Sequence, residues 1–419
     1  MKEYIHFRRN GQTVSFFRTP TEFAGNAFLP QKALVPISID AAKASPVVSY
    51  GQYVEEGELL ARALDANACD VHSPVPGFVG DLVRFQSDYH SSFECLPVLL
   101  EGRFEMLGKR ESKYQWRNTS VLELLRLIET KGLIVTTKPF LPLAKILRSN
   151  IRENNKTIQF ALFDFDISCG LEAELLRNFF WEVIEGLAIA AKIIDCRRIE
   201  FFYLGKLEPS IKEKIQSIVD FCECVFLRTK NNYPFYDLSK QKKDTPLVLL
   251  PSTVIYVYEA IVKDRPFISS YILLGGTAVN HPKLLKARIG TPIGNLIEEC
   301  EGLRTASTTI ILNGFLDGVK TKSFDIPINK TIKSITVIPL KHERSFFRLP
   351  CNSCACCTAS CPMHLNPAQL LRKIQRKDFD EIVLLQLRQC INCGVCSSCC
   401  ECRIPLARIF AKAKEERGL

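Results

Sequence analysis

The spacing of apolar residues changes along the chain and divides it into four regions. Up to about residue 103, short apolar runs are broken by glycine and proline, which predicts short β-strands. From 104 to 298, stretches with helical spacing alternate with extended apolar runs, which predicts an α/β layer with a mostly parallel sheet. Residues 299–345 again contain short strand-like runs, and 346–419 form a separate cysteine-rich region.

The second region gives the clearest secondary-structure predictions. Helices are expected over 121–130 and 171–194, and strands over 132–136, 158–163, 199–204, 224–227, 246–250 and 268–274. Residues 231–244 are polar and charged, so we expect a surface loop there. The chain contains no run of about 18 uninterrupted apolar residues, so no membrane-spanning helix is expected.

The first region repeats a pattern of two short strands around a glycine turn. Residues 51–61 place such a turn at Gly57, and residues 72–80 close a second half. This pairing resembles the barrel-sandwich hybrid of lipoyl and biotinyl carrier domains. Carriers need a lysine at the hairpin tip, whereas the tip here is Pro74-Val75-Pro76. We therefore interpret the region as a structural barrel and not as a swinging arm.

Charge and composition exclude several classes of function. The chain has 419 residues and a net charge of +10, which would suit an acidic electron carrier or an anionic membrane face, but the excess is spread along the chain. No basic, aromatic-rich nucleic-acid motif is present, so nucleic acid is not expected as a partner. The six histidines are scattered and no hydrolase motif occurs.

Eleven of the eighteen cysteines fall in the last 69 residues, and eight of them form two copies of the spacing C-x2-C-x2-C-x3-C. This spacing is typical of [4Fe–4S] ligands, and a tandem pair indicates a two-cluster ferredoxin. The fourth cysteine of each copy ligates the other cluster. We therefore expect one cluster on Cys351, Cys354, Cys357 and Cys400, and the other on Cys390, Cys393, Cys396 and Cys361.

Alternatives remain for the cysteine-rich region. Zinc is the rival metal, although zinc sites rarely use a third cysteine two residues after a C-x2-C pair. Three further cysteines could replace a ligand, but the set of eight is complete without them, so we interpret them as small buried residues. They are Cys356, Cys399 and Cys402. Reduced thiols favour a cytoplasmic location.

The segment between the two motifs predicts two short helices. Asn366 followed by Pro367 is a good helix start, and residues 379–387 form a second helical stretch. Two ligand loops separated by helices are typical of an α-helical ferredoxin domain.

Taken together, these regions resemble the RnfC family, peripheral components of the Rnf ion-translocating electron transport complex. The resemblance covers essentially the whole chain and implies four domains: a barrel-sandwich hybrid (1–103), a Rossmann-like α/β domain (104–298), a small β, SLBB-like segment (299–345) and a ferredoxin domain (346–419). The segments that carry it are Gly275-Gly-Thr-Ala-Val-Asn-His-Pro282, Arg288-Ile-Gly-Thr-Pro-Ile293, Val257-Tyr-Glu-Ala-Ile-Val262, Gly314-Phe-Leu-Asp-Gly318, Asp325-Ile-Pro327 and Cys402-Arg-Ile-Pro-Leu406.

The resemblance implies a function at a membrane. Members accept or donate electrons at the cytoplasmic face of the inner (plasma) membrane, with FMN and NADH on the Rossmann-like domain. Electrons pass through the clusters to membrane and iron–sulfur subunits, and ion movement is coupled to that flow. The implied soluble partner is NADH, ferredoxin or flavodoxin.

This sequence departs from the family at the nucleotide site. Of the family's G-x-G-G-A-x-F-P-T loop, only Gly132 and Pro142 survive. The flavin-contacting segment N-G-A-E-C-E-P corresponds to a stretch that begins at Asp164 and ends at Gly170, and a third family loop is shortened around residues 233–237. Gly132 and Asp164 are the remaining candidates for cofactor binding. We expect that ordinary FMN and NADH binding is lost, so that a reduced carrier protein feeds the clusters; a divergent FMN site is the alternative.

Two other functions remain open. One is a soluble iron–sulfur reductase of the cobalamin-reductase type, which would use the same scaffold with another acceptor. The other is a mainly structural docking subunit whose clusters do not turn over.

Overall fold

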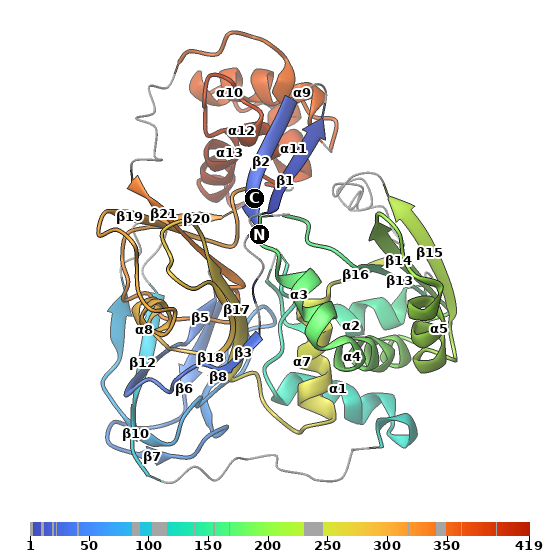
Figure 1. Ribbon diagram of the computed structural model, residues 1–419, viewed down its shortest axis with the longest axis vertical. Helices are drawn as coiled ribbons and strands as arrows, with labels where there is room; N and C mark the ends of the chain where they lie inside the picture. The colour runs from blue at the N-terminus through green and yellow to red at the C-terminus, as the bar shows by residue number, and fades with distance from the viewer. Residues whose placement is uncertain are drawn as a thin grey trace.

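The computed structural model describes residues 3–9, 12–18, 21, 23–39, 42–85, 93–102, 115–137, 140–153, 156–166, 168–229, 246–316, 318–340, 349–361, 363–390 and 392–419. The expected surface loop over 231–244 and the shortened family loop at 233–237 lie outside these residues. Figure 1 shows a β-rich part, an α/β part beside it and a cluster of short helices at one end of the molecule.

The α/β part contains the parallel sheet that the alternating pattern predicts. All of its pairings are parallel, in the order β15-β14-β13-β16. Its strands are β13 (Thr157–Ala161), β14 (Arg198–Leu204), β15 (Glu223–Thr229) and β16 (Leu247–Leu249). Phe160 and Phe201 on adjacent strands are fully buried and meet edge to face, with ring centroids 5.9 Å apart. This buried aromatic pair anchors the middle of the sheet.

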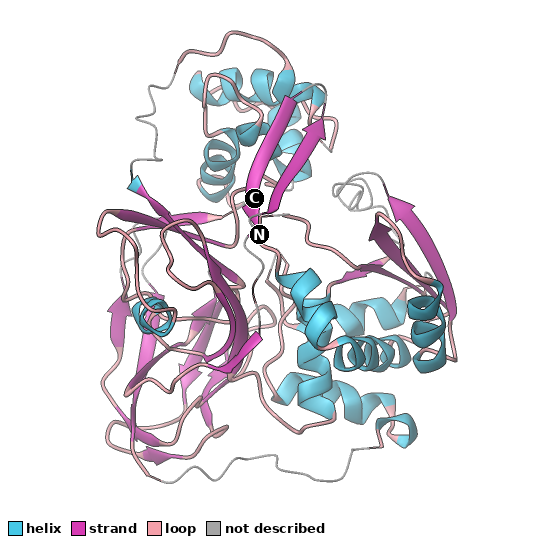
Figure 2. Ribbon diagram, in the orientation of Figure 1, coloured by secondary structure: helices cyan, strands magenta, loops and turns pink. Residues whose placement is uncertain are grey.

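Helices pack against the parallel sheet in the arrangement seen in Figures 1 and 2. They are α1 (Val121–Thr130), α2 (Leu143–Arg152), α3 (Leu171–Asn178), α4 (Phe180–Ile193), α5 (Pro209–Ile218) and α7 (Pro251–Ile261), with a short 3-10 helix, η1, at Trp116–Asn118. Helix α1 has the predicted bounds, and Ser120 caps it by accepting a hydrogen bond from the Glu123 amide.

The long helix predicted over 171–194 is wrong in one respect, because the chain breaks it into α3 and α4 at Phe179. Phe179 has φ −134° and ψ 40°, outside the helical region. Its ring packs against Phe23 at 4.8 Å and Tyr271 at 5.0 Å, measured between ring centroids. Both partners belong to a neighbouring sheet, so tertiary packing overrides the local helical pattern here.

Two predicted strands do not join the parallel sheet. The segment 268–274 forms β17 (Ser269–Gly275), which pairs in a separate mixed sheet with the order β20-β19-β21-β17-β18-β3. The segment 132–136 forms only an isolated bridge between Ile134 and Pro142, because Gly132 ends helix α1 instead. The other members of the mixed sheet are β3 (Phe23–Asn26), β18 (Lys283–Arg288), β19 (Thr308–Leu312), β20 (Val319–Thr321) and β21 (Ser334–Pro339), with helix α8 (Ile293–Glu299) between β18 and β19.

The N-terminal strands form two further sheets that close over one core. One has the order β11-β12-β10-β7, with β4 pairing to β12, and the other has the order β5-β6-β8-β9. The strands are β4 (Lys32–Pro36), β5 (Ser38–Ile39), β6 (Ala42–Pro46), β7 (Tyr53–Val54), β8 (Leu59–Ala63), β9 (Val71–His72), β10 (Gly77–Val79), β11 (Val83–Phe85) and β12 (Phe93–Leu100); a separate hairpin joins β1 (Glu3–Arg9) to β2 (Gln12–Arg18). The tip at Pro74, Val75 and Pro76 is buried, which agrees with a structural barrel.

Short helices make up the cysteine-rich module, residues 349–419. They are α9 (Cys356–Ala359), α10 (Pro367–Gln375), α11 (Glu381–Gln389), α12 (Val395–Ser398) and α13 (Leu406–Glu415), and they group at the top of Figure 1. The predicted start of α10 is confirmed, since the Asn366 side chain accepts a hydrogen bond from the Gln369 amide at 3.0 Å. Among the described residues, no helix is both long enough and apolar enough to cross a bilayer.

Helices α4 and α7 pack so closely that one added methyl group between them should lower the stability of the α/β part. A Cβ at Gly186 would lie 2.0 Å from the carbonyl oxygen of Val254 in α7. Gly186→Ala must therefore separate the two helices, and we expect it to lower the free energy of unfolding by about 2 kcal/mol. Urea titration followed by circular dichroism measures this loss.

Gly275→Ala is the matched control. A Cβ at Gly275 would meet only the Pro282 Cβ at 3.7 Å, an ordinary contact. We expect a change within about 0.5 kcal/mol for this variant. Equal losses for both variants would show that the α4–α7 contact is not the sensitive feature.

Candidate functional site

The cysteines of the second motif line one cavity together with a cysteine of the first. Cys390, Cys393 and Cys396 face this cavity, and Cys361 joins them from the end of the other motif. Burial, followed by the charges of Cys393, Cys390, Cys399 and Cys361, raises the pKa of the Cys396 thiol. Apolar side chains complete the wall, among them Met363, Leu365, Leu370 and Phe410. The crosswise set expected from the spacing is therefore found around one cavity.

Three of the four cysteines expected at the other cluster also lie near one another. Cys357 is buried, and its pKa is raised by burial and also by the nearby thiols of Cys400 and Cys351. The Cys354 thiol instead forms a hydrogen bond with Cys356. Cys400 therefore lies with the first motif although it belongs to the second in sequence.

The two motifs fold with the same backbone. In the first, Ser353 and Ala355 have positive φ angles of 60° and 58°; in the second, Asn392 and Gly394 at the corresponding positions have 51° and 76°. Each loop then enters a one-turn helix, α9 or α12, that carries the third cysteine. Alternating left-handed residues are what lets the chain curl tightly around one point.

The spacing of these sulfurs bears on the choice of metal. Within the described part of the chain, no three His, Cys, Asp or Glu side chains converge closely enough to ligate a single ion. A tetrahedral zinc site, with Zn–S bonds of about 2.3 Å, needs such convergence. A cubane cluster presents four separate iron corners, so its thiolates stand further apart. The assignment of the cysteine sets to clusters and not to zinc stays a prediction.

The extra cysteines pack beside the ligand sets. Cys402 is buried, and its carbonyl accepts a hydrogen bond from the Leu349 amide at 3.2 Å. Cys399 is partly buried against the hydrophobic core of the module, and burial raises its pKa to about 11. Their role as packing residues stays a prediction.

The cysteine-rich module contacts the mixed sheet through the second motif. A Cβ at Gly394 would lie 1.7 Å from the carbonyl oxygen of Leu316, so the two backbones touch. The Leu316 amide in turn donates to Asp166, which follows strand β13 of the parallel sheet. A single chain of contacts thus joins the module to the carboxyl edge of the parallel sheet.

Gly132, one of the two candidate cofactor residues, closes helix α1. Its amide donates to Glu129, the Leu133 amide donates to Ile128, and Gly132 has φ +66°. This is the Schellman arrangement that ends helices at glycine. The Gly132 carbonyl also accepts a hydrogen bond from the Lys330 ammonium at 2.8 Å. Gly132 therefore ends helix α1, and the described residues that follow it, 133–137 and 140–142, do not form a glycine-rich phosphate loop.

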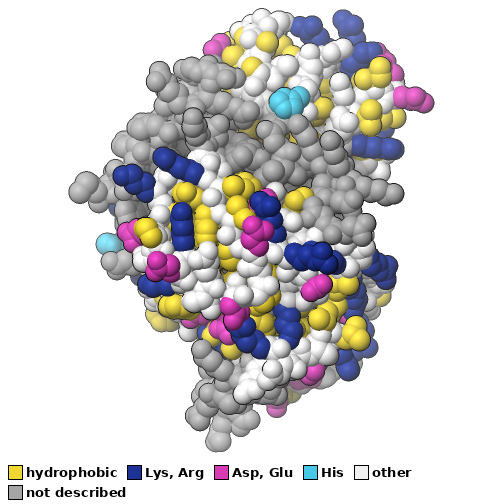
Figure 3. All heavy atoms as spheres, turned by 90° about the vertical axis from the view of Figure 1, so that its right-hand side faces the viewer, with side chains coloured by type: hydrophobic (Ala, Val, Ile, Leu, Met, Phe, Trp, Pro, Cys, Tyr) yellow, Lys and Arg dark blue, Asp and Glu magenta, His cyan; other side chains and the backbone are white. Residues whose placement is uncertain are grey.

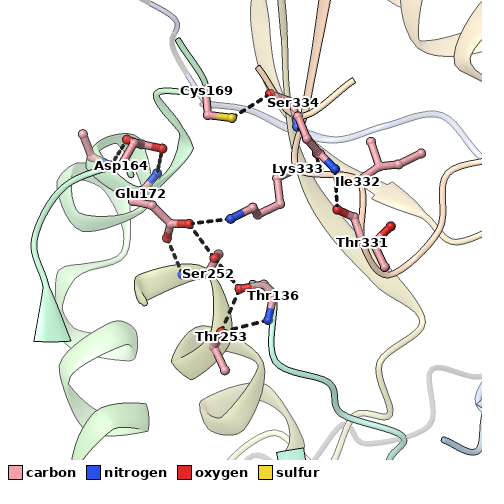
Figure 4. Close-up of polar contacts among 12 residues, drawn as sticks. Thr136, Asp164, Cys169, Glu172, Ser252, Thr253, Thr331, Ile332, Lys333 and Ser334 are labelled. Carbon is pink, nitrogen blue, oxygen red and sulfur yellow. Dashed lines mark hydrogen bonds and ion pairs between the residues drawn. The ribbon is translucent and has the colours of Figure 1, made fainter. Parts of the chain in front are cut away.

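The carboxyl edge of the parallel sheet, shown in Figure 4, is closed by the side chains of the chain itself. Glu172 is only 1% exposed, and its carboxylate accepts hydrogen bonds from the Ser252 amide at 2.7 Å and hydroxyl at 2.6 Å. Ser252 lies in the first turn of α7, so a carboxylate fills the anion site of that helix. Lys333 lies 3.2 Å from Glu172 and compensates its charge.

Hydroxyl groups extend this network to the remnant of the nucleotide loop. The Thr136 hydroxyl lies 2.7 Å from both the Ser252 and the Thr253 hydroxyls. The Thr136 amide donates to the Thr253 hydroxyl at 3.2 Å. The loop amide nearest to α7 is therefore already satisfied within the protein.

Asp164, the second candidate cofactor residue, caps helix α3. Its carboxylate accepts hydrogen bonds from the Glu172 amide at 3.1 Å and the Ala173 amide at 3.4 Å. Burial, followed by the charge of Glu172, raises the pKa of Asp164 to about 7. A flavin or nucleotide phosphate approaching this edge would meet two carboxylates instead of open helix N-termini.

Glu172, Lys333 and Ser252 were not predicted from the sequence. Glu172 and Lys333 are 161 residues apart, and neither stands in a recognisable motif. The only indication in the sequence is that these residues lie beside apolar runs. A charged residue next to a buried strand or helix needs a partner of opposite charge or a hydrogen bond. The sequence does not identify that partner.

Positive charge does not gather into one surface on the face shown in Figure 3. Lysine and arginine side chains are interspersed there with aspartate, glutamate and apolar groups. This agrees with the spread of charge along the sequence.

Comparison with known proteins gives one family-model match and several curated relatives. Residues 18–102 match the RnfC barrel sandwich hybrid domain, which confirms the barrel expected in this region. The C component of the proton-translocating ferredoxin:NAD(+) oxidoreductase complex of Clostridium ljungdahlii is 25% identical over 82% of this chain and 78% of that protein.

Two further relatives are the C components of complexes named as ion-translocating oxidoreductases. The protein of Methanosarcina acetivorans is 30% identical over 84% of this chain and 84% of its own length. That of Rhodobacter capsulatus is 21% identical over 92% of this chain and 78% of its own length.

The raised pKa of Asp164 predicts a pH dependence of stability. Between about pH 4 and pH 7 the folded protein holds a proton on Asp164 that the unfolded chain, with a pKa of about 3.9, has released. The contribution of Asp164 to the free energy of unfolding therefore falls as the pH rises through this window. The Asp164→Asn variant lacks this titrating group. The free energy of unfolding of the unaltered protein, measured relative to that of the variant, should therefore decline from pH 5 to pH 7.

Urea unfolding of both proteins at several pH values between 5 and 7 measures the difference. Parallel stability profiles for the protein and the Asp164→Asn variant would contradict the assignment of the shift to Asp164.

Proposed function

The chain belongs to the RnfC family, the C components of ion-translocating oxidoreductase complexes, and on this basis we propose that it is the peripheral electron-transfer subunit of such a complex. Electrons pass through two [4Fe–4S] clusters in the cysteine-rich module. The observation that carries this proposal is the crosswise arrangement in which Cys361 joins Cys390, Cys393 and Cys396 around one cavity.

Each cluster is assigned to its own cysteine set. Cys351, Cys354, Cys357 and Cys400 hold one, and Cys361, Cys390, Cys393 and Cys396 hold the other. A bound [4Fe–4S] cluster takes up and releases one electron at a time. The cysteines fix the clusters as thiolates, while the apolar wall around Phe410 limits water, which tunes the potential.

The proposed electron donor is a reduced carrier protein such as ferredoxin or flavodoxin. Direct use of NADH through FMN is disfavoured, because Glu172 fills the N-terminus of α7 and Asp164 that of α3. Displacing Glu172 would leave the partly buried Lys333 without this counter-charge, which is costly. The clostridial relative is named for a complex that acts on ferredoxin and NAD(+), and both names belong to that complex as a whole.

The proposed location is the cytoplasmic face of the inner (plasma) membrane. Membrane and iron–sulfur subunits of the complex would receive the electrons, and ion movement would take place in those subunits. Membership of the family supports this placement.

Substituting one cysteine of each set should remove one cluster each. We expect Cys354→Ser and Cys393→Ser to reduce the iron content from about eight to about four atoms per chain, since each set holds one four-iron cluster. Iron analysis of anaerobically purified protein measures the stoichiometry.

Cys356→Ser and Cys402→Ser are the matched controls, because they lie among the ligands without belonging to either set. Both should keep about eight iron atoms. Full iron content in Cys354→Ser and Cys393→Ser would overturn the ligand assignment.

The closed sheet edge predicts a protein without flavin. Purified protein should contain no stoichiometric FMN, and NADH should leave the iron–sulfur absorbance unchanged. Dithionite should bleach that absorbance and produce the paramagnetic signals of reduced clusters. Electron paramagnetic resonance spectra recorded before and after addition of NADH or dithionite show which of the two reduces the clusters.

A fast NADH-driven bleaching with one FMN per chain would contradict the proposed donor. Clusters that dithionite fails to reduce would instead favour the structural docking subunit. The first result would favour NADH as the electron donor, and the second would favour a structural role.

A further inference from the structure

A large cleft lies between the N-terminal barrel and the α/β part. Its walls are the turn from β8 to β9 on one side and helices α1 and α2 on the other, and its volume is about 720 Å³. None of its lining residues belongs to the cysteine sets or to the closed sheet edge. Pockets of about 300–1,000 Å³ are typical of small-molecule sites. We call it the arginine cleft.

Three arginines line the arginine cleft. Arg62 comes from β8, Arg126 from α1 and Arg152 from α2. Among the described residues, none of these guanidinium groups has a hydrogen bond or an ion pair. Guanidinium groups that converge from three elements on one cleft suit an anion with several oxygen atoms.

The carboxylates in the cleft are already engaged. Glu129 forms a bidentate pair with Arg148, at 2.9 and 2.6 Å. Asp65 accepts hydrogen bonds from the amides of its own turn, and Asp70 accepts one from the Ala63 amide at 3.0 Å. The cleft lining therefore carries five basic side chains against three carboxylates, a net charge of +2: Arg62, Arg126, Lys145, Arg148 and Arg152 against Asp65, Asp70 and Glu129.

Apolar side chains, four of them alanines, line part of the cleft, and we call this part the floor. They are Ala63, Ala66, Ala68, Leu133 and Ala144. Small residues leave room for a flat ring, whereas a site for phosphate alone needs no such floor.

Two lysines hold the walls together. Lys145 of α2 donates to the Asn67 side chain of the barrel turn at 2.6 Å. Lys330 is buried and donates to the carbonyls of Asp70 and Gly132, at 2.9 and 2.8 Å, one on each wall. The cleft is therefore formed before any ligand arrives, which lowers the ordering cost of binding.

We propose that the arginine cleft binds a nucleoside phosphate. The ring lies on the alanine floor, and the phosphates are held by Arg62, Arg126 and Arg152. The ligand is bound and released unchanged. This site is separate from the closed sheet edge, so it stands or falls independently of the proposed electron path.

Isothermal titration of the complete, iron-loaded protein with ADP tests the proposal. Adenosine carries only the ring and pyrophosphate carries only the charge, so we expect both to bind at least tenfold more weakly than ADP. The double variant Arg126→Gln/Arg152→Gln should weaken ADP binding at least tenfold. Both arginines are exposed, so the variant should fold normally.

Ala66→Trp provides a second variant that leaves the charge unchanged. Ala66 is exposed on the barrel turn, and an indole there would cover the floor, so ADP binding should be lost. Arg376→Gln is the control, because Arg376 is an exposed arginine of the cysteine-rich module, remote from the cleft lining. It should bind ADP as the unaltered protein does.

Three results would overturn the proposal. The first is no ADP binding at millimolar concentration. The second is binding that both the double variant and Ala66→Trp retain. The third is pyrophosphate binding as tight as that of ADP, which would exclude a nucleotide as the ligand.

Discussion

The carboxylate of Glu172, held at the N-terminus of α7 and against Lys333, is the constraint on which the architecture around the parallel sheet depends. It joins the α/β part to the mixed sheet, because Lys333 immediately precedes β21. A buried ion pair of this kind is costly to break, because removing one partner leaves the charge of the other partner uncompensated. The same contact takes the position at which a helix N-terminus would otherwise attract a phosphate. The Glu172 contact thus stabilises the fold and also supports the proposed loss of the flavin site.

The contacts at the sheet edge also reach the cysteine-rich module. Asp166 binds the Leu316 amide, and the Leu316 carbonyl lies against Gly394 in the second cysteine motif. These contacts place the second cysteine motif beside the carboxyl edge of the parallel sheet. With the edge closed, the module retains its cysteine sets, and the proposed route begins at the clusters themselves.

Local features of the fold were predictable from the sequence. The cap at Asn366 and the bounds of α1 depend on neighbouring residues, and both are confirmed. The cysteine spacing likewise led to one set, Cys361 with Cys390, Cys393 and Cys396, that lies together around a cavity, although its role as a ligand set stays a prediction. In each of these cases, a few adjacent residues carry the signal.

Features set by distant residues were not predictable. Phe179 breaks the expected helix because Phe23 and Tyr271 pack on its ring. The segment at 268–274 has the apolar pattern of a strand, but its partner in another sheet decides where it lies. The Glu172–Lys333 pair spans 161 residues. The division into four domains also stays a prediction.

Anomalous scattering at the iron absorption edge, from crystals of anaerobically purified protein, tests the two-cluster assignment most directly. We expect two compact iron peaks, one among Cys351, Cys354, Cys357 and Cys400 and the other among Cys361, Cys390, Cys393 and Cys396. The Glu172–Ser252 contact should be intact, with no flavin density beside it. A single peak, a zinc edge in place of iron, or a flavin lying where Glu172 contacts α7 would contradict the assignment.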